Sequence, residues 1–163
     1  MSIASLLGVA AMAVGAHIFG RLYKEYLFRG QAELEEYLLF LKHLRRRVSL
    51  DSEPYFSASM SFEGKLLIEN GFLEFIKNGL SPKDAFDKAS ASGRVLEKER
   101  ELVRNALGEL GRNALTDELK SRDIHISLIE EGLQHSREEL QRKIKSTYAI
   151  ILATALGIGI LLL

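Results

Sequence analysis

The sequence predicts an all-α protein, in which an antiparallel bundle of about six helices lies between two terminal transmembrane helices. Three observations support this prediction. The chain has 163 residues with 22 basic and 22 acidic side chains, yet residues 1–20 and 146–163 contain none of these charges. Apolar residues in the middle of the chain recur at helical steps of three and four. The chain also contains only two prolines, and its middle shows no alternating pattern typical of strands.

The first predicted element is a transmembrane helix over residues 1–20. Residues 3–20 form an uncharged run of eighteen residues, and a bilayer core about 30 Å thick needs roughly 17–25 helical residues. A cleaved signal peptide is the alternative, although the run lacks a basic n-region and has a poor cleavage pattern. The sequence leaves open whether this segment is retained.

The central segment, residues 21–147, is predicted to be a helical bundle domain. It opens with a long helix that continues from the first span without a Gly–Pro break. Its core stripe consists of Leu34, Tyr37, Leu38, Leu41, Leu44 and Val48. At the other end, a helix from about residue 122 runs into the second transmembrane segment, residues 148–163. The core stripe of that helix consists of Ile126, Ile129, Leu133, Leu140 and Ile144.

Shorter helices are predicted between these two. Ser81 as N-cap, Pro82 at the first helical position and Asp84 mark one start, directly after an Asn78-Gly79 stop signal. Residues 51–54 mark another start, and a third lies at residues 116–117. Two glycines three residues apart, Gly108 and Gly111, indicate a helix end or a close backbone contact. The predicted aromatic core consists of Phe56, Phe62, Phe72, Phe75 and Phe86, and the stripe of the following helix of Leu96, Val103, Leu107 and Leu110.

Basic residues flank both uncharged ends on the side of the central segment. They are Arg21, Lys24 and Arg29 after the first, and Arg137, Arg142, Lys143 and Lys145 before the second. Because positive residues stay on the cytoplasmic side, we expect the central segment to be cytoplasmic and both termini to lie outside. The lack of cysteine agrees with a cytoplasmic domain.

The sequence carries no motif that indicates catalysis, a cofactor or a metal. It has no cysteine nucleophile, nucleophile elbow, phosphate loop or dinucleotide fingerprint. Glu131 and His135 lie one helical turn apart, but two ligands without a third are typical of a solvated face. The balanced net charge of zero argues against nucleic-acid binding. We therefore expect a protein that is not an enzyme and that binds no nucleic acid.

The strongest run of like charges is Arg45, Arg46 and Arg47 at the end of the first long helix. One interpretation is a favourable interaction with the helix C-terminus; the other is contact with an acidic partner. Candidate partner-binding residues are these three arginines together with Gly111 and Arg112. Self-association of the chain stays open.

Nearly the whole chain resembles the stage III sporulation protein AB family of endospore-forming bacteria. The resemblance rests on the uncharged start, the stripe from Leu34 to Val48 before a turn with Pro54, residues 78–86 (NGLSPKDAF), residues 107–112 (LGELGR) and the final helix with its apolar tail. The chain departs from the family where it has Ala114 and Glu118 in place of an acidic residue and a glutamine. It also has Arg47 before Val48, where the family usually has an acidic residue.

The resemblance implies a fold similar to half of the cytoplasmic part of the platform protein of type II secretion and type IV pilus machines. It implies a place in the channel between mother cell and forespore, on the mother-cell side in the outer forespore membrane. The implied partners are the lipid bilayer, a cognate secretion-type ATPase and other channel components. A membrane-anchored helical adaptor or sensor outside sporulation is the alternative, and a small membrane enzyme is the weakest reading.

Overall fold

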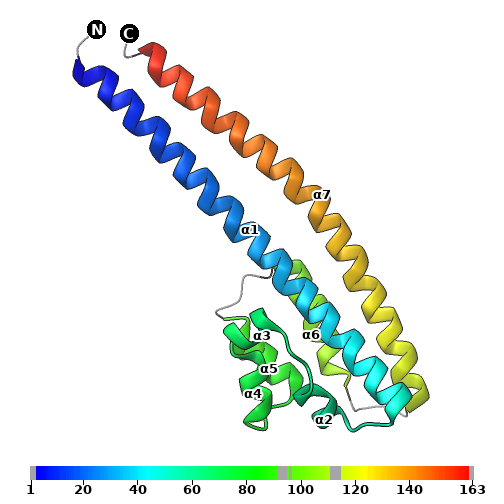
Figure 1. Cartoon of the computed structure of the whole chain (residues 1–163). Helices are drawn as coiled ribbons and strands as arrows, with labels where there is room; N and C mark the ends of the chain where they lie inside the picture. Colours follow the sequence, from blue (N-terminus) through cyan, green and yellow to red (C-terminus); the bar gives the residue numbers. More distant parts are fainter. Residues whose placement is uncertain (1–2, 92–94, 96, 111–114, 162–163) are drawn as a thin grey trace. The chain divides into compact units, whose positions relative to one another are not determined.

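The computed structural model describes residues 3–91, 95, 97–110 and 115–161; the side chains of residues 115, 116 and 118 and of several residues near both chain ends are not described. Over the described ranges the protein is all-α, with seven helices and no strand, which confirms the predicted class (Figure 1). The helices are α1 (Ile3–Asp51), α2 (Tyr55–Met60), α3 (Lys65–Glu69), α4 (Phe72–Lys77), α5 (Pro82–Ala89), α6 (Glu97–Gly108) and α7 (Leu115–Leu161).

The chain divides into two compact units. The terminal unit combines Met1–Phe28 with Arg137–Leu163, and the bundle unit is Arg29–Ser136. In the terminal unit, α1 and α7 run antiparallel, so Ile3 and Leu161 lie at the same end of this unit (Figure 1). Gly20 lies at the contact, where an added Cβ would be 3.6 Å from Ile151 Cδ1. Within the described residues, no helix has a stretch that is long and apolar enough to cross a membrane.

The core of the bundle unit is built on the predicted stripes of α1 and α7. All six predicted core residues of α1 are buried, as are Ile126, Ile129 and Leu133 of α7. The short helices α2–α5 lie beside the second half of α1 (Figure 1). Four fully buried rings occupy the centre, with edge-to-face contacts between them at centroid distances of 5.0–5.2 Å. These rings belong to Tyr37, Phe40, Phe72 and Phe86.

The predicted aromatic core is correct in part. Phe72 and Phe86 are buried, and Phe62 and Phe75 are partly buried at the edge of the core. Phe56 is 57% exposed, so its assignment to the core was wrong. The reason is geometric: α2 is buried through Ala58 and Ser59, and a residue two positions before Ala58 lies on the opposite side of a helix.

Several predicted helix ends are confirmed. The Ser81 hydroxyl accepts a hydrogen bond from the Asp84 backbone N–H at 3.2 Å, with Pro82 at the first position of α5. Helix α4 ends at Lys77, followed by Gly79 with a φ of 86°. Helix α7 begins seven residues before the predicted position 122, because no glycine or proline separates the start signal at residues 116–117 from the long helix.

Candidate partner-binding surface

The three arginines of the predicted site differ in the side chains that they contact. Arg45 pairs with Asp123 of α7: one N–H of its Nη2 donates to Asp123 Oδ2 at 2.9 Å, and its Nε–H donates to the other carboxylate oxygen. These hydrogen bonds, helped by the opposite charges, raise the pKa of Arg45 and lower the pKa of Asp123. Both side chains are about half exposed. Solvent therefore screens the pair, and such pairs contribute at most about 1 kcal/mol.

The contribution of the Arg45–Asp123 pair to stability is expected to depend on pH. Because the pKa of Asp123 is lower in the folded chain, the pair stabilises the fold above the ordinary carboxyl value of about 3.9. This contribution is lost as the pH falls through the folded pKa. We expect Arg45→Met to lower the free energy of unfolding by up to about 1 kcal/mol at pH 6 and by almost nothing in strong acid. Urea unfolding at stepped pH measures this difference.

The matched control for that experiment is Arg46→Met, which removes a neighbouring charge that has no ion pair within the described part of the chain. Its effect on stability is expected to vary little with pH. If the effect of Arg45→Met is the same at pH 6 and in strong acid, lost packing of the arginine stem, rather than the ion pair, explains it.

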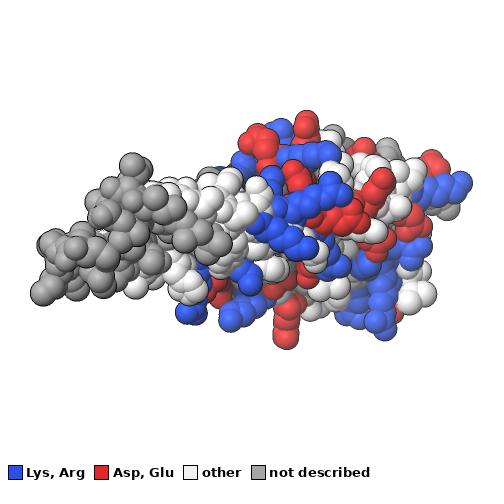
Figure 2. Space-filling view, turned by 90° about the horizontal axis from the view of Figure 1, so that it is seen from above, with Lys and Arg blue, Asp and Glu red and all other residues white. Residues whose placement is uncertain are grey.

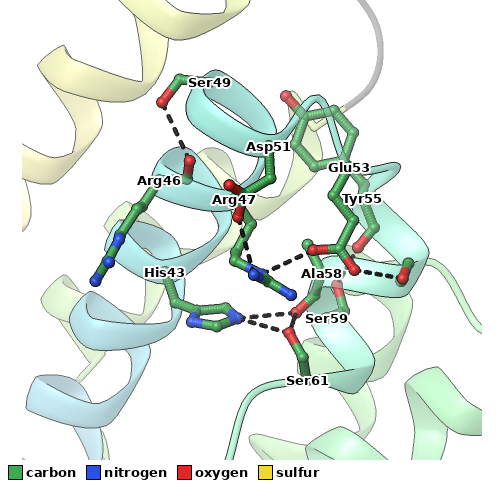
Figure 3. Close-up of polar contacts among 11 residues, drawn as sticks. His43, Arg46, Arg47, Ser49, Asp51, Glu53, Tyr55, Ala58, Ser59 and Ser61 are labelled. Atoms are coloured by element: carbon green, nitrogen blue, oxygen red, sulfur yellow. Dashed lines mark hydrogen bonds and ion pairs between the residues drawn. The ribbon is translucent and has the colours of Figure 1, made fainter.

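Arg47 is turned toward the loop between α1 and α2 (Figure 3). Its guanidinium contacts Asp51 Oδ2 at 2.9 Å and Glu53 Oε2 at 2.7 Å. Between these two acids lies Ser52, which has a φ of 51°, a left-handed conformation that costs free energy in a residue other than glycine. Arg47 therefore joins the last turn of α1 to both sides of a tight turn, and its charge is neutralised within the chain.

Arg46 is the member of the triplet left available. Its guanidinium points away from the cluster around Arg47 (Figure 3). Among the described residues its side chain makes no hydrogen bond or ion pair, and its backbone carbonyl accepts a hydrogen bond from Ser49 Oγ at 3.3 Å. Gly111 and Arg112, the other two predicted site residues, lie outside the described residues.

Exposed apolar side chains lie on the same helix face as this arginine and on α7. Leu39 and Leu50 of α1 are exposed, Leu50 to 73%. Spacings of seven and four residues place Leu39, Arg46 and Leu50 on one helix face, opposite the buried stripe. Helix α7 likewise exposes Ile124 and Leu128. We call these five residues the outer face. The ion pairs Lys42–Glu130 and Arg45–Asp123 join the two helices that carry it.

A buried arginine also connects α7 to α2. Arg122 is only 4% exposed, its guanidinium lies 4.7 Å from the centre of the Tyr55 ring, and its Nη2 donates to the Tyr55 hydroxyl at 2.6 Å. No sequence pattern predicts this contact, because Arg122 and Tyr55 are 67 residues apart. The contact fixes α2 against the helix that carries Ile124 and Leu128.

Charge is distributed unequally between the two units. The bundle unit has 16 basic and 19 acidic residues, a net charge of −3, whereas the terminal unit has six basic and three acidic residues, a net charge of +3. On the face shown in Figure 2, basic and acidic side chains are intermixed. A surface of this kind does not attract polyanions as a continuous basic patch would.

Neither a metal site nor a known relative gives further guidance. Glu131 and His135 are both exposed, and within the described ranges no three side chains come together that could hold a metal ion. No protein-family model, curated protein or solved structure matches this chain.

Proposed function

We propose that this chain is a non-enzymatic membrane platform that docks a cytoplasmic secretion-type ATPase, as a component of the sporulation channel between mother cell and forespore. Both uncharged ends lie in the outer forespore membrane, and the central segment lies in the mother-cell cytoplasm. The channel and the ATPase are proposed from the family resemblance. The membrane anchoring and the docking surface are proposed from the residues of this chain.

The observation that carries the proposal is the placement of charge along two long helices. Helix α1 includes the uncharged residues 3–20 before its charged segment, and α7 passes from its charged segment into the uncharged residues 146–161. The basic excess of the terminal unit borders these ends. Uncharged helical ends flanked by basic residues are typical of membrane anchors with a cytoplasmic middle.

The outer face is the docking surface in this proposal. On α1, exposed Leu39 and Leu50 share a helix face with Arg46, whose guanidinium has no ion pair within the described part of the chain. Ile124 and Leu128 are exposed on α7. Interfaces of this kind combine apolar contacts with a central arginine, which is among the residues most often found to dominate binding energy. The matching partner surface presents a carboxylate among apolar side chains.

Reversing the charge at Arg46 tests the docking surface. We expect Arg46→Glu to weaken co-purification with the ATPase about 10-fold or more, since an interfacial arginine commonly contributes about 2 kcal/mol. The variant breaks no ion pair among the described residues, unlike reversal of all three arginines, which would also break those of Arg45 and Arg47. The control Lys98→Glu makes the same charge change at an exposed position on α6. Equal ATPase recovery with Arg46→Glu and Lys98→Glu would exclude the outer face.

The membrane topology has a separate test. Because the chain contains no cysteine, single cysteines at Ser2 and at the exposed Ala91 report their own positions without background. We expect a membrane-impermeant thiol reagent to label them from opposite sides of the membrane. Labelling of both from the same side would contradict two spans, whatever the result with the ATPase.

A further inference from the structure

The terminal unit contains a cavity of about 490 Å³, whose lining includes none of the five residues of the outer face. On α1 it is lined by His17, Arg21, Lys24, Glu25 and Phe28, and on α7 by Tyr148. Steps of four, three and four residues place His17, Arg21, Lys24 and Phe28 on one face of α1. The cavity therefore extends along three helical turns and is bounded by the second helix.

The cavity lies at the boundary between the charged part of the chain and its two uncharged ends. Arg21 is the first charged residue of the chain, and Lys145, three residues before Tyr148, is the last. At this level α1 and α7 are in contact, because a Cβ added at the buried Gly20 would lie 3.8 Å from the Tyr148 ring. In a membrane-anchored chain, a tyrosine beside the first basic residues is placed at the lipid headgroups.

The cations of this cavity are incompletely paired. Arg21 donates to Glu25 Oε1 through Nε at 3.0 Å, and its two terminal nitrogens make no hydrogen bond within the described residues. The Lys24 ammonium lies 5.6 Å from the centre of the Phe28 ring and has no ion pair in the same part of the chain. Two groups of N–H donors one helical turn apart are therefore available to a single anion.

We propose that this cavity binds the phosphate of an anionic phospholipid. Arg21 and Lys24 hold the phosphate by charge-assisted hydrogen bonds. The acyl chains lie along the uncharged ends of α1 and α7. Basic pockets between membrane helices on the cytoplasmic side are suited to such headgroups. The proposal rests on the membrane anchoring proposed above, because it requires the terminal unit to lie in a bilayer.

The test is lipid retention by the full chain, purified in detergent and examined by native mass spectrometry. The probes are phosphatidylglycerol and phosphatidylcholine with identical acyl chains. We expect the wild-type chain to retain phosphatidylglycerol in preference to phosphatidylcholine. The double variant Arg21→Gln/Lys24→Gln should lose about 10-fold or more of that preference. The control Arg142→Gln/Lys145→Gln removes the same charge beside the other uncharged end, at exposed residues that do not line the cavity, and should stay within about twofold of wild type.

Three results of the lipid-retention experiment would overturn the proposal. Retention unchanged in Arg21→Gln/Lys24→Gln would exclude the cavity, and an equal loss in both double variants would assign the preference to the general basic excess of the terminal unit. Displacement of the lipid by millimolar glycerol phosphate would assign the site to soluble phosphate compounds.

Carbonate extraction of cell membranes distinguishes a failure of this proposal from a failure of the membrane anchoring on which it rests. Release of the wild-type chain would contradict anchoring, whereas chains that stay in the membrane without lipid preference would contradict the cavity alone.

Discussion

Replacing Phe72 with alanine is expected to lower the free energy of unfolding of the bundle unit by about 3–5 kcal/mol. Phe72 is fully buried and forms edge-to-face contacts with Tyr37 and Phe40 at centroid distances of 5.1 and 5.2 Å. Truncation removes the transfer free energy of the ring, leaves a cavity between two large rings that cannot collapse freely, and abolishes both aromatic contacts.

The matched control is Phe56→Ala, which removes the same ring from an exposed position on α2. We expect it to change stability by no more than about 0.5 kcal/mol. Urea unfolding of the full chain in detergent, followed by circular dichroism, compares the two. Since domains of this size are stable by only about 5–15 kcal/mol, Phe72→Leu is included as a milder variant, expected to cost about 1–2 kcal/mol. Equal unfolding midpoints for Phe72→Ala and Phe56→Ala would contradict the core described above.

The contrast between these two phenylalanines shows what the sequence could predict. The faces of α1 and α7 are defined by many helical turns. All six stripe residues predicted on α1 are buried, as are four of the five predicted on α7, and Ile144 is half-buried. Helix α2 has only six residues, too few for a periodicity to reveal its buried face. Phe40 was not assigned to the core, although it is fully buried, because it lies at the edge of a wide stripe.

Local signals predicted local structure, and contacts distant in sequence were not predictable. The Ser81 cap and the Gly79 stop depend on residues within four positions of each other. The fate of the arginine triplet depends on tertiary structure: Asp123, the partner of Arg45, is 78 residues away. The run of three adjacent arginines suggested that all three contact an acidic partner, whereas the fold pairs Arg45 and Arg47 with carboxylates of the chain itself.

A carboxylate from α1 caps a helix formed 30 residues later, and its removal is the second large effect we expect. Glu36 Oε2 accepts backbone N–H groups of Leu66 at 2.8 Å and of Leu67 at 3.1 Å. Helix α3 has only five residues, and its N-cap, Gly64, provides no side-chain acceptor. A Cβ at Gly64 would lie 2.8 Å from the same carboxylate oxygen, so the glycine leaves room for the cap that it cannot itself supply.

We expect Glu36→Ala to lower the free energy of unfolding by about 2–3 kcal/mol, because two N–H groups at the start of α3 lose a charged acceptor. Glu36→Gln should fall between alanine and wild type, since a neutral amide oxygen accepts more weakly. Glu63→Ala is the control, an exposed glutamate without a partner among the described residues.

Hydrogen exchange distinguishes capping from a general loss of stability. The amides of Leu66 and Leu67 should lose protection in Glu36→Ala beyond the change at neighbouring core amides. If their protection changes only in step with those amides, Glu36 stabilises the bundle by another route, and the short helix α3 is held by the packing of Leu67 alone.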